Sequence, residues 1–128
     1  FSQEERKMTT MTLKKPNTKS IMIVKIGGSI LQESPAFTAL ISDLAELHKS
    51  GSSIVVVHGG GPAVESKLAQ LHQKSENTAA SPSTKVNGLR VTDAATLEVV
   101  SQVLSALNIY LSEKLSEQKV KSAGFVPQ

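Results

Sequence analysis

The sequence predicts an α/β fold, specifically a three-layer α/β/α sandwich around a mainly parallel central sheet. Two observations lead to this class. Short runs of β-branched and apolar residues alternate along the chain with longer segments of helical periodicity. The first two runs are apolar on both faces, which is typical of parallel strands covered by helices on both sides. With 128 residues, the chain is long enough for one such domain.

The first strand and helix are expected in residues 20–51. "SIMIVKI" (20–26) is apolar on both faces and ends at the glycine pair 27–28. Residues 34–51 have helical spacing, with Ser34 as the N-cap and Gly51 as the stop. The apolar positions of that helix are Phe37, Leu40, Ile41, Leu44 and Leu47.

The second strand and helix follow directly. "SIVVVH" (53–58) predicts another buried strand, which runs into the glycines 59–61. Residues 62–74 predict a helix with Pro62 in its first turn, where the missing N–H costs nothing. The small polar residues 75–85 predict a loop or a flexible insertion.

A long helix is expected over residues 91–118, capped by Thr92 or Asp93. Its apolar residues form one broad stripe, which indicates a core face and is also suited to a dimer interface. The stripe consists of Leu97, Val100, Val103, Leu104, Leu107 and Leu111. "KVKSAGF" (119–125) is expected to begin a third strand.

Composition excludes several functional classes. The chain has no cysteine, so disulfides, thiolate catalysis and zinc–thiolate sites are excluded. No signal peptide or membrane-spanning apolar run is expected, which favours a reducing, cytoplasmic location. The net charge is +3, with much of the excess in residues 1–20. We interpret that segment as a basic, solvated leader rather than a nucleic-acid-binding arm, and residues 21–128 as the domain.

The two glycine clusters predict a ligand site. Both follow a strand, and the carboxyl ends of parallel strands meet at one edge of a sheet, where ligands bind. Glycine lets backbone N–H groups approach an anion, and a helix that starts there favours negative charge. Lys25 could place an ammonium among phosphate oxygens, as phosphoryl transfer requires. A plain turn is the alternative for Gly27 and Gly28.

Other glycine motifs fit poorly. Neither Gly-x-Gly-x-x-Gly nor the Walker sequence occurs in the chain. The "HGGG" after the second strand is similar to an esterase oxyanion loop, but the chain lacks the Gly-x-Ser-x-Gly elbow that a serine hydrolase would need.

Three segments together resemble the amino-acid kinase family. They are "IVKIGGSIL" (23–31), "VVVHGGGPAV" (55–64) and "VNGLRVTDAATLEVV" (86–100), in the family's order. The third is most similar to the N-acetylglutamate kinases of that family. The resemblance covers residues 21–104 and implies the N-terminal, acceptor-binding portion of the amino-acid kinase fold.

The resemblance implies a chemistry. The enzymes transfer a phosphoryl group from MgATP to the γ-carboxylate of N-acetyl-L-glutamate, which gives an acyl phosphate in arginine biosynthesis. Lys25 matches the lysine that stabilises the transferring phosphoryl group in the transition state. Gly27 and Gly28 match the turn whose N–H groups hold phosphate oxygens. No covalent enzyme intermediate is required.

The acceptor site is implied in the same way. Gly60 and Gly61 match glycines whose backbone contacts the substrate, and we expect a Cβ at Gly60 to take the ligand's place. Arg90 matches the arginine that binds a substrate carboxylate. ATP and Mg²⁺ are implied as MgATP, and no protein metal ligand is identified.

Alternative interpretations accompany these residues. Lys25 could be an exposed charge at a strand end. His58 is interpreted as a packing and hydrogen-bonding residue with no catalytic role. Arg90 could pair with Asp93 or Glu98 on the surface.

The resemblance stops short of a whole enzyme. Family members are longer, and their nucleotide-binding half has no counterpart in this sequence, so the isolated chain is expected to be inactive. Two alternatives stay open: another family member acting on a related acidic substrate such as an aminoadipate derivative, or a non-catalytic acceptor-binding and assembly module. A homodimer or higher homo-oligomer through helix 92–115 is expected, with neither nucleic acid nor membrane as a partner.

Overall fold

A computed structural model describes residues 21–74, 84–87, 89–91 and 93–126. Within these residues the fold is α/β, as the sequence predicts. Strands β1 (Ile21–Ile26) and β2 (Ser53–His58) pair in parallel, with Ile21 opposite Ser53 and Ile26 opposite His58. The parallel register brings both carboxyl ends, and therefore both glycine clusters, to the same edge.

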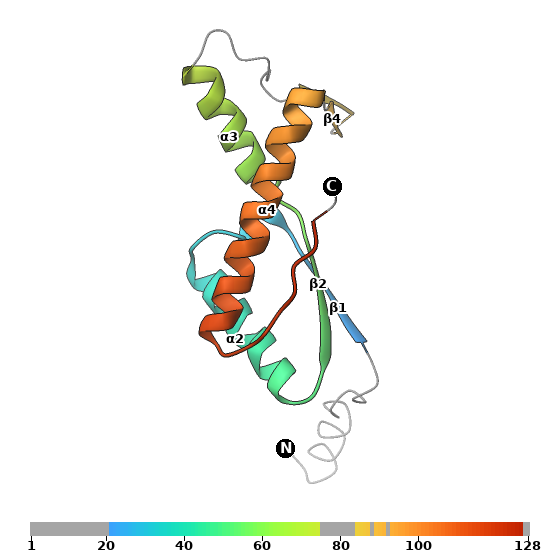
Figure 1. Ribbon diagram of the computed structural model, residues 1–128, viewed down its shortest axis with the longest axis vertical. Helices are drawn as coiled ribbons and strands as arrows, with labels where there is room; N and C mark the ends of the chain where they lie inside the picture. The colour runs from blue at the N-terminus through green and yellow to red at the C-terminus, as the bar shows by residue number, and fades with distance from the viewer. Residues whose placement is uncertain (1–20, 75–83, 88, 92, 127–128) are drawn as a thin grey trace, which may run out of the picture.

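One face of this sheet is covered by helices. Helix α2 (Pro35–Lys49) and the C-terminal half of α4 (Ala94–Glu117) lie on the same side of β1 and β2 (Figure 1). Ser34 caps α2 as expected, accepting a 3.1 Å hydrogen bond from the Phe37 N–H. The core between these elements contains Ile26, Leu31, Phe37, Ile41, Leu44, Ala45, Leu111, Leu115 and Val120.

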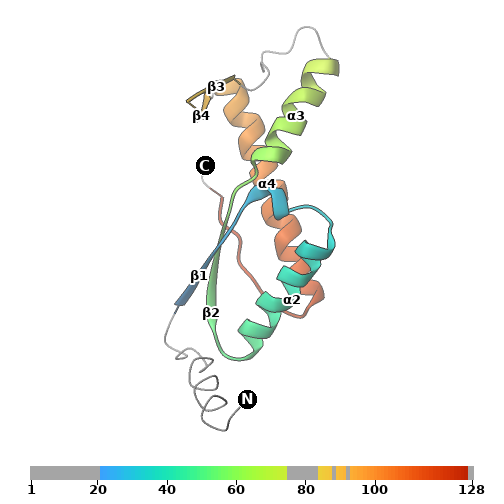
Figure 2. The same ribbon diagram turned by 180° about the vertical axis from the view of Figure 1, so that it is seen from behind.

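The other face of the sheet is exposed, contrary to the expectation of strands buried on both sides. Ile21 and Ile23 are 66% and 71% exposed, and Val55 and Val57 of β2 are also open. Within the described ranges, helices cover only the opposite face (Figures 1 and 2). The apolar character of both strand faces therefore exceeds what this part of the fold buries.

Helix α3 (Gly61–Lys74) begins directly at the second glycine cluster, with Pro62 in its first turn. It runs beyond the strands, beside the N-terminal half of α4 (Figure 2). Val64 and Leu68 of α3 and Val99 of α4 form a second small core. Most of the expected loop, residues 75–83, lies outside the described residues.

Helix α4 joins the two cores. Asp93 is its N-cap, so of the two expected caps the structure supports this one, while Thr92 lies outside the described residues. Val99 packs against α3, and Leu111 and Leu115 pack in the core between α4, α2 and the sheet. Leu97 of the expected stripe is 59% exposed and belongs to neither core. By length and composition alone α4 could cross a membrane, but its buried residues contact the protein's own cores.

A short hairpin precedes α4. Strands β3 (Thr84–Val86) and β4 (Leu89–Val91) pair antiparallel. Asn87 in the turn has φ 52°, a left-handed conformation that asparagine tolerates better than most residues. The hairpin replaces the end of the expected loop and the first residue of the expected helix.

The expected third strand is not formed. After α4, Lys119 takes φ 62° and the Val120 N–H donates to the Leu115 carbonyl at 3.0 Å, which closes the helix. Residues 120–126 then run between α4 and β2 without strand assignment (Figure 1).

Asp93 generates a prediction about pH. The Thr96 backbone N–H donates to its carboxylate at 2.7 Å and lowers the pKa of Asp93 below its usual value. A lowered pKa means that the charge stabilises the fold above the unfolded-state pKa of about 3.9, and this contribution disappears as the pH falls through the lower folded-state pKa. Asp93→Asn, which keeps a capping oxygen without the charge, should therefore be less stable than wild type at pH 7 and equal to it near pH 2.

Urea unfolding at both pH values measures this difference. Asp93→Ala, which removes the capping oxygen as well, should be less stable than the Asn variant at pH 7. A stability difference between wild type and the Asn variant that does not change with pH would contradict the role of the charge.

Candidate phosphate and substrate site at the glycine turns

The two glycine turns are in direct contact. A Cβ built on Gly28 would lie 2.8 Å from the Gly60 nitrogen and 2.9 Å from its Cα. Both of these are backbone atoms, which cannot rotate away as a side chain can. The sequence prediction that both clusters meet at one edge is therefore confirmed, and Gly28 is required by its neighbour's backbone.

Gly60 is a glycine for a different reason from the one expected. A Cβ there would lie 2.7 Å from Leu107 Cδ1 and 3.0 Å from Leu104 Cδ2, so it would meet α4 rather than occupy a ligand's place. The prediction of a ligand-facing Cβ at Gly60 is wrong. Gly61 is exposed, and nothing lies within 4 Å of its Cβ position.

The turns offer backbone donors. The Gly59 N–H is used by the Ile26 carbonyl at 3.3 Å, which extends the ladder between the strands. The N–H groups of Gly28 and Gly60 donate to no other residue in the described part of the chain. Gly28 is half-buried and Gly60 is buried. Backbone N–H groups on adjoining turns are of the kind that bind an anionic oxygen.

The helices that follow the turns are unequal. The first turn, with Gly27 as N-cap, enters the three-residue 3₁₀ helix η1 (Gly28–Ile30), and α2 starts only at Pro35. The second turn enters the 14-residue helix α3 directly. The expectation that each turn feeds a helix dipole therefore applies in full only to the second turn.

Lys25 lies on the exposed face of the sheet. It is opposite Val57, and the alternation along β1 places it on the side away from α2 and α4. Its ammonium is solvent-accessible next to the end of the strand, two residues before Gly27. Among the described residues no cluster of histidine, aspartate or glutamate could hold a metal ion.

Arg90 is not brought to the glycine turns. It lies in β4 opposite Lys85, at the N-terminal end of α4 (Figure 1). The turns contact α4 at Leu104, ten residues after the start of the helix, which is roughly 15 Å along its axis. The alternative pairing partner Asp93 uses its carboxylate to cap α4.

Sequence reasoning missed a polar contact beside the turns. The Asn108 side-chain nitrogen lies 3.4 Å from His58 Nε2, and His58 Nδ1 lies 3.0 Å from the Gly59 carbonyl oxygen. The "HGGG" sequence identified His58, but nothing in the local pattern of α4 singled out Asn108. This contact supports the expected hydrogen-bonding role of His58.

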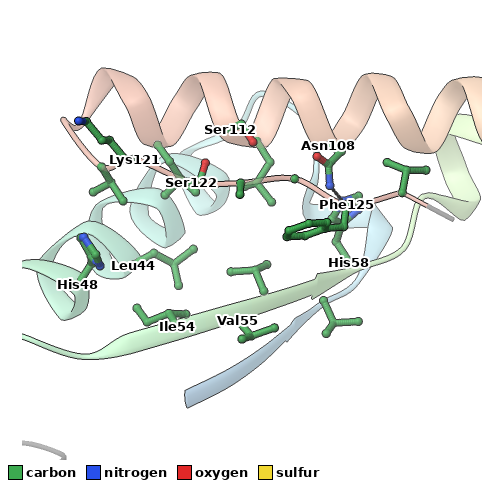
Figure 3. A pocket seen from close by; sticks show the side chains of 18 of the residues that line it. Leu44, His48, Ile54, Val55, His58, Asn108, Ser112, Lys121, Ser122 and Phe125 are labelled. Atoms are coloured by element: carbon green, nitrogen blue, oxygen red, sulfur yellow. Dashed lines mark hydrogen bonds between the residues drawn. The ribbon is translucent and has the colours of Figure 1, made fainter. Parts of the chain in front are cut away.

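A cavity of about 750 Å³ lies between β2, α4 and residues 120–126. Its lining is mostly apolar, with His58 and Asn108 at one end and His48 and Lys121 at the other (Figure 3). Neither Gly28 nor Gly60 lines it. The candidate anion site and this cavity are therefore separate places.

The fold and the site together define a class. Glycine turns in contact at the carboxyl ends of two parallel strands are typical of α/β proteins that bind a ligand at that edge of the sheet. The sequence profile of the amino acid kinase family matches residues 20–128. The chain belongs to the amino-acid kinase family, as the three motifs indicate.

Individual relatives agree with this membership. The chain is 38% identical over 110 residues to the acetylglutamate kinase of Pelagibacter ubique, and the match covers 86% of this chain and 35% of that protein. Further acetylglutamate kinases match over a similar stretch. The chain thus spans about a third of the length of the curated relatives it matches.

Solved structures have the same fold. A Streptococcus mutans protein, smu.665, superposes with a TM-score of 0.59 at 34% identity, covering 80% of this chain and 38% of its own. N-acetylglutamate synthase from Neisseria gonorrhoeae, solved with coenzyme A and L-arginine, superposes with a TM-score of 0.64 at 19% identity. That match covers 100% of this chain and 27% of the synthase, and at this identity it concerns the fold alone.

The glycine contacts predict an order of stabilities. Gly28→Ala should lose about 1–3 kcal/mol of unfolding free energy, because its methyl group would overlap backbone atoms. Gly60→Ala should lose less, because the leucine side chains that it meets can rotate. Gly61→Ala is the matched control and should be neutral or stabilising, since its Cβ has open space in the first turn of α3.

Thermal or urea unfolding of the three variants measures this order. Leu107→Ala combined with Gly60→Ala should cost less than the sum of the two single changes, because the shorter side chain makes room for the methyl group. Equal stability of the Gly28 and Gly61 variants would contradict the contact between the turns.

Proposed function

We propose that this chain is the acceptor-binding part of an acetylglutamate kinase, which transfers a phosphoryl group from MgATP to the γ-carboxylate of N-acetyl-L-glutamate. The observation that carries the proposal is the direct contact of the two turns at Gly28 and Gly60, whose N–H groups donate to no other residue among those that the structure describes. The names of the relatives supply the substrate. The proposed pathway is arginine biosynthesis.

Some of the proposed site residues would bind the transferring phosphoryl group, and others would bind the acceptor. The Gly27 and Gly28 turn would hold phosphate oxygens, and Lys25 would neutralise the charge that develops on the transferring group. The turn at Gly60 and Gly61 would hold the acceptor carboxylate in line for attack. The carboxylate itself is the nucleophile, so no side chain of this chain needs to be deprotonated.

Arg90 is proposed to bind the other carboxylate of the acceptor. Since its strand lies roughly 15 Å along α4 from the turns, one small substrate could contact both only if the hairpin approaches them. We therefore expect substrate binding to be weak without that approach. The nucleotide, with its Mg²⁺, would bind residues outside this chain.

A homo-oligomer is proposed through α4. The helix exposes Leu97 and Ile109, each 59% accessible, in addition to the residues that it buries. These exposed side chains lie on the helix through which the resemblance implies association. We also propose a cytoplasmic enzyme with neither nucleic acid nor membrane as a partner, as the resemblance implies.

A titration followed by NMR tests the acceptor site. N-acetyl-L-glutamate should shift the amide signals of Gly28 and Gly60, while N-acetyl-L-glutamine, which lacks the γ-carboxylate, should shift them much less. N-acetyl-L-aminoadipate distinguishes the related substrate, and a larger response to it would replace the proposed acceptor. If neither amide signal shifts with any of the three compounds, the proposal that this chain binds the acceptor is contradicted.

Lys25 generates a prediction about turnover. Residues 20–128 can replace the matching segment of the Pelagibacter ubique enzyme, and the chimera can be assayed for acyl phosphate as the hydroxamate. Lys25→Ala should lower kcat by about 10²–10³-fold with little change in KM, because the charge acts on the transition state. Lys67→Ala, an exposed lysine of α3, is the matched control. Unchanged kcat in the Lys25 variant would remove it from the chemistry.

A further inference from the structure

His58 lies where the second glycine turn, α4 and the C-terminal segment meet. It is the last residue of β2 and is half-buried, on the face of the sheet that carries the helices. Figure 3 shows its ring directed towards Asn108 of α4, with Phe125 close by. The proposed chemistry assigns it no role, although its hydrogen bonds involve the turn that carries Gly60.

The contacts determine which ring nitrogen carries the proton. Nδ1 lies 3.0 Å from the Gly59 carbonyl oxygen, and a carbonyl can only accept a hydrogen bond, so Nδ1 is the donor. In a neutral ring Nε2 is then an acceptor. It faces the Asn108 side-chain NH₂ group at 3.4 Å, which is able to donate. The Nδ1–H tautomer therefore satisfies both contacts.

Asn108 is itself held in place. A Cβ on Gly124 would overlap the Asn108 side chain, with Cγ at 2.8 Å, so the backbone of residue 124 lies directly over the amide. On α4, Asn108 is adjacent to Leu107 and four residues from Leu104, the two side chains that abut Gly60. The same part of α4 therefore contacts the glycine turn directly and through His58.

The hydrogen bond to Gly59 fixes the direction of the Gly60 N–H. The Gly59 carbonyl and the Gly60 N–H belong to one planar trans peptide, so they point in opposite directions and cannot turn independently. The Gly60 N–H donates to no other described residue, so the carbonyl contact with His58 is the hydrogen bond that this peptide makes within the described part of the chain. The neighbouring peptides are held by the bonds from the Gly59 N–H to Ile26 and from the Val64 N–H to the Gly60 carbonyl. Glycines on both sides of the peptide would otherwise let it rotate easily.

We infer that His58 is a positioning residue, whose Nδ1–H tautomer, held by Asn108, fixes the Gly59–Gly60 peptide with the Gly60 N–H available to the anionic substrate. The identity of that substrate rests on the proposed function. The tautomer and the peptide orientation rest only on the contacts of His58 with Gly59 and Asn108. The ring acts through the backbone and does not touch the reacting atoms.

The tautomer can be measured without any ligand. Long-range ¹H–¹⁵N correlation spectra of the imidazoles should show a pyrrole-type Nδ1 and a pyridine-type Nε2 for His58 at neutral pH. His48 and His72 are exposed and provide the comparison within the same sample. Asn108→Leu should weaken the preference of His58, and Ser112→Ala, one turn further along α4, should leave it unchanged. A predominant Nε2–H form in wild type would overturn the inference.

Two substitutions separate positioning from mere packing. His58→Asn can place an amide N–H near the position of Nδ1, where it can still donate to Gly59, whereas His58→Gln places its amide near the position of Nε2. The Asn variant should keep the wild-type Gly60 amide signal and N-acetyl-L-glutamate affinity. The Gln variant should shift that signal and weaken binding about tenfold.

The outcomes distinguish this inference from the proposed function. If wild type shows the Nδ1–H tautomer and the Gly60 signal follows the two variants as described, but N-acetyl-L-glutamate does not bind, the proposed function fails and the positioning role stands. If N-acetyl-L-glutamate binds equally to both variants, the positioning role fails and the proposed function stands. Thermal unfolding checks that each variant folds. If a variant does not fold, the tautomer of His58 in the wild-type protein decides whether the positioning role stands.

Discussion

The contact between Gly28 and Gly60 is the constraint on which the rest of this structure depends. Two backbones can approach this closely only where neither residue has a Cβ, and the parallel register of β1 and β2 brings them to the same level. This approach brings onto adjoining turns the N–H groups of Gly28 and Gly60, which donate to no other described residue. A larger residue at position 28 would separate the turns and disperse the candidate site.

Helix α4 supports that contact from outside. It packs against α3 through Val99 and against the strands and α2 through Leu111, with Leu104 and Leu107 against Gly60 between these two regions. The helix is therefore shared by both small cores, neither of which is large. The position of the second turn depends on a helix that starts more than thirty residues after it, so long-range packing determines local geometry at the site.

The sequence predicted the elements whose signals are local. Strands β1 and β2, the Ser34 cap and the meeting of the two turns follow from apolar runs, capping chemistry and parallel topology. The hairpin at 84–91 was missed although Asn87-Gly88 is a recognised turn signal. Its two strands are only three residues each, and the first begins inside the small polar segment that predicts a loop. The reason for a glycine at position 60, the exposure of Leu97 and the place of Arg90 depend on how α4 lies across the other elements, which no local pattern encodes.

The open face of the sheet has a consequence for the behaviour of the chain in solution. Ile21 and Ile23 form an apolar row along β1, and Lys25 continues that row with a charge. Stacking this face on another molecule would remove the ammonium from water, which is costly without a partner charge. A surface that covers this face must therefore leave the ammonium of Lys25 in contact with water or supply it with a partner charge, and the proposed chemistry uses the same charge.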